Sequence, residues 1–99
     1  MSSRIKMWEA LKAFQPYANK HAFGEAWERM TTDRTEKSAK DVQRVMWQVT
    51  KLEPLSVHYA REAADCAVEA ITQKNRKVAF WARMSIWHVK NAIEFEAQQ

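Results

Sequence analysis

His58, Glu62 and Asp65 are the residues of this 99-residue chain whose types and spacing come nearest to a catalytic or metal-binding set. Glu62 follows His58 by four positions, so on a helix both side chains share a face, and Asp65 comes one turn later. A metal site needs a third or fourth ligand, and the sequence contains neither a Glu-x-x-His nor a His-Glu-x-x-His motif. We therefore expect a solvated acidic helix face here, with no metal and no cofactor.

The other reactive residues have no sequence neighbours that imply catalysis. His21 and His88 lack a nearby partner for acid-base work. Cys66 lies among small residues, where a free cysteine usually behaves as a small hydrophobic side chain. Because it is the only cysteine, it cannot form an internal disulfide, which fits a reducing compartment. We expect a protein without enzymatic activity that acts in the cytoplasm.

The scarcity of glycine and proline determines the expected fold class. The chain has one glycine, Gly24, and two prolines, Pro16 and Pro54. Hairpin turns favour Asn-Gly or Asp-Gly pairs, and phosphate-binding loops need several glycines at fixed spacing, but the sequence has neither feature. With 46% hydrophobic and 28% charged residues the chain can form a core, and no stretch is long and apolar enough to span a membrane. We expect an all-α fold, a compact bundle of four to five helices that forms a single domain over residues 1–99.

Capping residues, prolines and hydrophobic periodicity place the helices. A serine near the start can cap the first helix, and a proline should end it because the residue before proline avoids the helical region. The fourth helix has a buried side of small residues, which predicts a central or tightly packed position. The expected helices run from Ser2 or Ser3 to Pro16, from about residue 17 to 30 with a bend or break at Gly24, from Thr35 to Pro54, from Pro54 to about residue 74, and from Asn75 to about residue 97, with residues 31–35 as a loop.

The last of these helices has two apolar faces. Small and hydrophobic residues between Val78 and Val89 already form a sufficient core face. On the opposite side, cations and aromatic rings alternate at the spacing i, i+4, i+7, i+11 and i+14. These residues, which we predict to bind a partner or a ligand, are Arg76, Phe80, Arg83, Trp87 and Lys90.

Charge is segregated between the helices. Residues 74–90 contain five cations and no acid, whereas residues 53–69 contain four acids and a single cation, Arg61. The helix from Thr35 to Pro54 carries a second basic and aromatic stripe, away from its valine face. Its members, also predicted to contact a partner or ligand, are Lys40, Arg44 and Trp47, with Lys51 one turn later.

Three interpretations of the stripes remain open. In the first, Phe80 and Trp87 are buried by neighbouring helices, and the acidic helix meets the cations across a helix pair. In the second, the stripes form a protein interface, because tryptophan, arginine and phenylalanine are typical binding anchors. In the third, they bind an anionic ligand, since cations hold phosphate while aromatic rings stack on bases. The net charge of +4 is compatible with the third interpretation but is too small to favour it.

The segment YANKHAFGEAWERMTTDRT, residues 17–35, and the alanine-rich EAADCAVEA, residues 62–70, resemble small all-helical accessory proteins encoded by tailed phages. The resemblance implies a protein that occupies a surface of a host protein, such as a nuclease, polymerase or defence factor, or one that sequesters nucleotides, in the host cytoplasm. We expect an interaction protein or inhibitor that binds a host protein, or that self-assembles into an oligomer, through the aromatic and basic helix face. The alternative is nucleic-acid or nucleotide binding by the basic residues of the two stripes.

Overall fold

The computed structural model describes residues 2–49, 55–73 and 76–98, and all of its regular elements in these ranges are helices. The all-α prediction is confirmed, but the helices number six in the described ranges rather than four to five. They are α1 (Ser3–Ala13), α2 (Gln15–Lys20), α3 (Gly24–Asp33), α4 (Glu36–Val49), α5 (Leu55–Thr72) and α6 (Lys77–Ala97).

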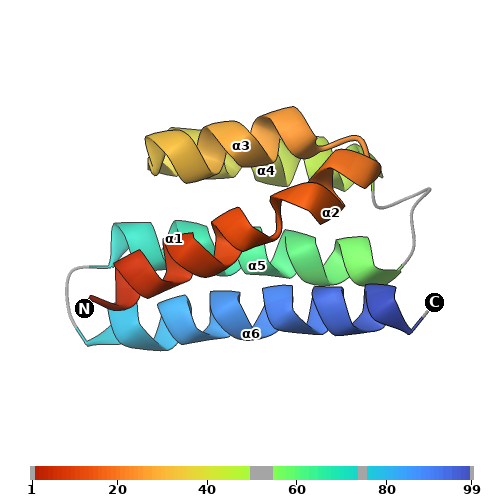
Figure 1. Cartoon of the computed structure of the whole chain (residues 1–99). Coiled ribbons are helices and arrows are strands. Elements are labelled where there is room, and N and C mark those ends of the chain that lie inside the picture. Colours follow the sequence, from red (N-terminus) through yellow and green to blue (C-terminus); the bar gives the residue numbers. More distant parts are fainter. Residues whose placement is uncertain (1, 50–54, 74–75, 99) are drawn as a thin grey trace.

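The helices stack in tiers (Figure 1). In the view of Figure 1, α6 runs along the lower edge, α1 and α5 lie above it, and α3 and α4 form the top. α6 makes its main contacts with α5 and α1, while α4 packs against α5 and α3. One side of α6 therefore faces away from the other helices.

The first helix begins as predicted but does not end as predicted. Ser2 caps α1, since its hydroxyl accepts a hydrogen bond of 3.2 Å from the backbone N–H of Ile5. α1 ends at Ala13, however, and Pro16 lies in the first turn of α2. Proline fits this position because the first backbone N–H groups of a helix have no intrahelical partner. Pro16 therefore helps to start a helix instead of ending one.

The predicted helix over residues 17–30 is divided into α2 and α3, which accounts for the additional helix. Ala22 has a positive φ of 64°, and α3 begins at Gly24. A β-carbon at position 24 would collide with the side-chain oxygen of Asn19. The amide of Gln15 stabilises this corner, because it donates to that oxygen at 2.8 Å and to the Gly24 carbonyl at 2.9 Å. Glycine allows the close approach of Asn19 here and does not supply an unusual backbone angle.

The expected loop at residues 31–35 is shorter in the structure. α3 continues to Asp33 and ends at Arg34, whose φ is 57° and whose N–H donates to the Met30 carbonyl at 2.8 Å. Thr35 caps α4 as predicted, since its hydroxyl accepts from the Ser38 N–H at 3.2 Å. The helix end at Pro54, the cap at Asn75 and the side chain of Lys51 lie outside the described residues.

An aromatic cluster fills the core between α1, α2 and α3. The ring of Phe14 lies 5.2 Å from that of Trp27 and 6.3 Å from that of Phe23, measured between centroids. The indole N–H of Trp27 donates to the Leu11 carbonyl at 2.7 Å, so this buried polar atom is satisfied. These three rings are almost completely buried.

α5 occupies the central position that its small side chains predict. Its alanines at 60, 63, 64, 67 and 70 are fully buried, which lets α6 approach closely. The Ser85 hydroxyl on α6 donates to the Ala63 carbonyl at 2.7 Å. Arg4 of α1 binds the carboxyl end of α5, because its guanidinium donates to the carbonyls of Ala70 at 3.0 Å and Gln73 at 2.6 Å.

Candidate interaction surface

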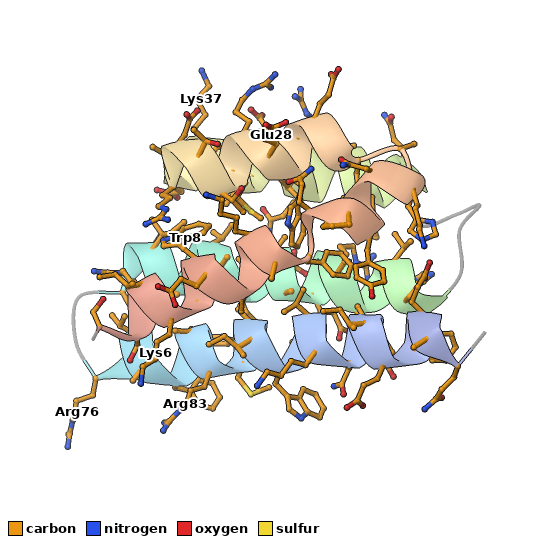
Figure 2. The ribbon with its side chains drawn as sticks, viewed as in Figure 1. Lys6, Trp8, Glu28, Lys37, Arg76 and Arg83 are labelled. Carbon is orange, nitrogen blue, oxygen red and sulfur yellow. The ribbon has the colours of Figure 1, made fainter. Side chains whose placement is uncertain are left out.

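The outer face of α6, which we define as Arg76, Phe80, Arg83, Trp87 and Lys90, is exposed. Phe80 is 49% exposed and Trp87 56% exposed, whereas Ala82, Ser85, Val89 and Ala92 on the opposite side are buried. Arg76 and Arg83 extend away from the other helices (Figure 2). The interpretation in which this chain buries Phe80 and Trp87 is therefore wrong. The physical reason is that α6 lies at the edge of the bundle and packs on one side only.

A shallow hollow lies on this face. It has a volume of about 330 Å³ and is lined by Arg83, Met84 and Trp87. Phe80 and Trp87 contact their neighbours Trp81 and His88 edge-on, at ring-centroid distances of 5.1 Å in both cases. The outer face thus offers aromatic surface together with a recess that a side chain of a partner can enter.

Lys40, Arg44 and Trp47 form a second surface, at the groove between α4 and α5. The groove has a volume of about 610 Å³ and is also lined by Gln43, Arg61 and Asp65. Trp47 is 66% exposed, and the guanidinium carbon of Arg61 lies 5.1 Å from the centre of its ring. The predicted site residues therefore divide into two surfaces, because α5 separates α4 from α6.

The two surfaces differ in how their cations are balanced. On α4, Lys40 pairs with Glu36 at 2.8 Å and Arg44 with Asp41 at 3.3 Å. On the outer face of α6, Arg76, Arg83 and Lys90 make no ion pair with any described residue. The positive charge of α6 is thus available to a partner, whereas that of α4 is partly neutralised within the helix.

Glu62 and Asp65 of α5 contact residues other than the cations of the outer face of α6. Glu62 lies 3.2 Å from Nδ1 of His88, a distance typical of an ion pair although the two atoms are not aligned for a hydrogen bond. Asp65 accepts from the side-chain amide of Gln43 at 2.7 Å. The first interpretation of the stripes pairs the acidic helix with these cations, but Glu62 contacts His88 and Asp65 contacts Gln43.

The described residues contain no cluster of metal ligands, and the Cys66 thiol is buried. No three His, Cys, Asp or Glu side chains of residues 2–49, 55–73 and 76–98 are grouped so that they could hold a metal ion. Burial, and to a smaller extent the carboxylates of Asp65, Glu62 and Glu69, raise the pKa of the Cys66 thiol to about 11. Cys66 is therefore protonated at neutral pH, and a protonated thiol is a poor nucleophile.

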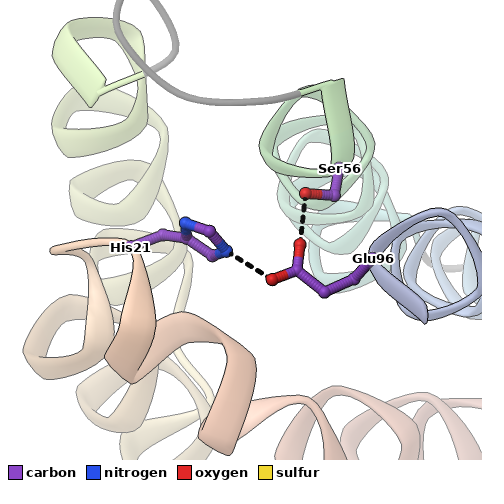
Figure 3. Close-up of polar contacts among 3 residues, drawn as sticks. All are labelled: His21, Ser56 and Glu96. Atoms are coloured by element: carbon purple, nitrogen blue, oxygen red, sulfur yellow. Dashed lines mark hydrogen bonds and ion pairs between the residues drawn. The ribbon is translucent and has the colours of Figure 1, made fainter. Parts of the chain in front are cut away.

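A polar network of His21, Ser56 and Glu96 was not predicted from the sequence (Figure 3). Nε2 of His21 lies 2.9 Å from Glu96 Oε1, and the Ser56 hydroxyl donates to Glu96 Oε2 at 2.7 Å. The hydrogen bond from Ser56, and then the contact with His21, hold the pKa of Glu96 below its usual value. Because the hydroxyl bonds to the carboxylate and not to the imidazole, the trio is not arranged as a Ser-His nucleophile pair. It links the ends of α2, α5 and α6.

The sequence pattern also missed Arg61, which contacts Trp47 from another helix. No local spacing could have revealed this contact or the His21 network, since their members are far apart in the chain. No protein-family model matches the chain, and neither a curated protein nor a solved structure does. None of the helices in the described part of the chain is long and apolar enough to cross a bilayer.

Proposed function

We propose that this chain is a non-enzymatic binding protein that docks the outer face of α6 onto another protein molecule. One observation carries the proposal: Phe80 and Trp87 are 49% and 56% exposed on a helix that already has a complete core face. Exposed aromatic residues flanked by arginine are the composition of binding hot spots. The resemblance to phage-encoded accessory proteins makes a bacterial host protein one candidate partner and a second copy of this chain the other.

The charge of the outer face supports a protein partner with acidic groups. Arg76, Arg83 and Lys90 make no ion pair among the described residues, so their charges can complement carboxylates of a partner. Phe80 and Trp87 supply the apolar area that an interface core requires.

The test compares the double variant Phe80→Ala and Trp87→Ala with the wild-type chain and with Trp47→Ala as the matched control. Each protein is immobilised and incubated with a bacterial lysate, and its mass in solution is measured in parallel. We expect the double variant to lose the bound protein or the self-association while its helical circular dichroism stays unchanged, and we expect Trp47→Ala to keep both. If the wild-type chain binds no protein and is monomeric, or if the double variant binds as well as wild type, the proposal is wrong.

The groove between α4 and α5 supports a second candidate function, the binding of a nucleotide or single-stranded nucleic acid. Lys40, Arg44 and Arg61 surround the exposed ring of Trp47, an arrangement suited to phosphate contacts and base stacking. The fluorescence of the chain is titrated with ATP and with an oligonucleotide. Binding should weaken by at least about tenfold between 50 and 200 mM salt, because phosphate neutralisation releases counterions. Absence of binding at low salt, or an affinity that salt leaves unchanged, contradicts this candidate.

A further inference from the structure

The outer face of α6 continues to Glu94, which the sequence pattern had not included. Glu94 follows Arg76 by five full helical turns, so both residues lie on one line along the helix. Both side chains are exposed, and neither makes an ion pair with another described residue. From its amino end to its carboxyl end, the face then consists of Arg76, Phe80, Arg83, Trp87, Lys90 and Glu94.

The six residues of this face can pair favourably with the same six residues of a second α6 that runs in the opposite direction. In an antiparallel pair of identical helices related by a two-fold axis, residues at equal distances from the axis lie opposite each other. An axis level with Ser85 places Arg76 opposite Glu94, Phe80 opposite Lys90, and Arg83 opposite Trp87. Each pair occurs twice by symmetry, and each is either an ion pair or a cation beside an aromatic ring.

Neighbouring registers lack this complementarity. An axis level with Arg83 places Arg76 opposite Lys90, which are like charges. An axis level with Trp87 places Phe80 opposite Glu94 and leaves Arg83 opposite Asn91, so no cation meets a ring or a carboxylate. The register level with Ser85 is favoured because it pairs all six residues of the face with one another.

The hollow on the outer face lies at the centre of that register. It is lined by Arg83, Met84 and Trp87, with a volume of about 330 Å³. With the axis level with Ser85, Trp87 of a second copy lies level with Arg83 and beside Met84, where it can enter the hollow. A tryptophan that fills a recess on its partner is the usual form of an interface anchor.

We propose that a second copy of this chain binds the outer face of α6, with the two α6 helices antiparallel about a two-fold axis level with Ser85. The inference rests on the proposed function, because it identifies the protein that docks on this face. An unrelated acidic partner would account for the cations, whereas the second copy also uses Glu94 and the hollow.

The first experiment measures mass by light scattering and the dissociation constant by sedimentation equilibrium. The wild-type chain should have twice its monomer mass of 11.6 kDa. Trp87→Ala should raise the dissociation constant by at least about 30-fold, as expected for a central anchor. Trp47→Ala, an equally exposed tryptophan away from α6, should leave the constant unchanged. Circular dichroism confirms that each variant remains helical.

The second experiment reverses the charges of the terminal pair. Arg76→Glu and Glu94→Arg should each weaken the dimer by about tenfold, because each places like charges opposite each other twice. The double variant should restore the wild-type constant. Residues 18 positions apart on one helix are separated by about 27 Å, so a contact within one chain cannot explain such a rescue.

The outcomes separate this inference from the proposed function. A wild-type chain that is monomeric up to about 100 μM overturns the homodimer, whereas binding of a lysate protein that depends on Phe80 and Trp87 would still uphold the proposed function. A dimer that Trp87→Ala leaves intact uses another surface and overturns the homodimer through α6. The proposed function is overturned as well only if no lysate protein binds through Phe80 and Trp87. A double charge variant as weak as the single variants overturns the antiparallel register.

Discussion

Two groups of aromatic residues in this molecule have the same side-chain types and opposite environments. Phe14, Phe23 and Trp27 are enclosed where α1, α2 and α3 meet, and the indole N–H of Trp27 bonds to a backbone carbonyl. Phe80 and Trp87 lie on one long helix and are about half exposed. Short helices joined by tight corners surround a ring from several sides, whereas a long helix at the edge of a bundle buries only one face. The first group is therefore expected to determine stability and the second to determine binding.

The largest effect on stability should come from the enclosed group. Trp27→Ala removes a fully buried ring and its hydrogen bond, so it should lower the free energy of unfolding by about 3 to 5 kcal/mol. Urea denaturation followed by circular dichroism measures the change. A loss below about 1 kcal/mol would mean that the core around Trp27 is not packed as the structure shows.

A smaller loss of stability is expected when the network of His21, Ser56 and Glu96 is disrupted. Glu96→Ala removes the acceptor of both Ser56 and His21, so it should cost about 1 to 3 kcal/mol. Asn91→Ala, on the same helix but outside this network, is the matched control. Equal effects of the two substitutions in urea denaturation would show that the network does not stabilise the fold.

The same carboxylate gives the stability a pH dependence in acid. Because the pKa of Glu96 is lower in the folded chain than its ordinary value of 4.5, its contribution is complete above that pH. The contribution is lost as the pH falls further, through the lowered folded pKa. We therefore expect the wild-type chain to lose more stability than Glu96→Gln between pH 5 and about pH 3. If the free energy of unfolding of the two proteins falls equally with pH, Glu96 is not the cause of the acid sensitivity.

A still smaller effect is expected at the groove between α4 and α5. Trp47 is 66% exposed, so a double-mutant cycle of Arg61→Ala and Trp47→Ala should give a coupling energy of about 0.5 to 1 kcal/mol. A coupling near zero would mean that the guanidinium does not rest on the ring in solution.

The smallest effects on stability are expected on the outer face of α6. Phe80→Ala and Trp87→Ala should each change the free energy of unfolding of the monomer by about 0.5 kcal/mol or less, since both rings are about half exposed. The measurement is made in dilute solution, so that self-association does not contribute. A loss similar to that of Trp27→Ala would place these rings in the core and remove the difference between the two groups.

The sequence predicted the helices better than their connections. The alanines of α5 and residues Ala39, Val42 and Met46 of α4 follow the helical period, so their burial could be expected from spacing alone. A bend or break at Gly24 was predicted, and the structure shows a break. Which of the two forms depends on the side chains of Gln15 and Asn19 at one corner. Pro16 was assigned the wrong role, since proline is compatible with both the end of one helix and the first turn of the next.

By itself, the sequence determined the helical content, the central position of α5 and the two faces of α6, because these follow from glycine scarcity and from side-chain spacing along single helices. Only the tertiary structure decided that Phe80 and Trp87 remain exposed, that α5 separates the two basic surfaces, and that His21, Ser56 and Glu96 meet. The physical reason is that a helical period defines which residues share a face, whereas the packing of other helices defines which faces are covered.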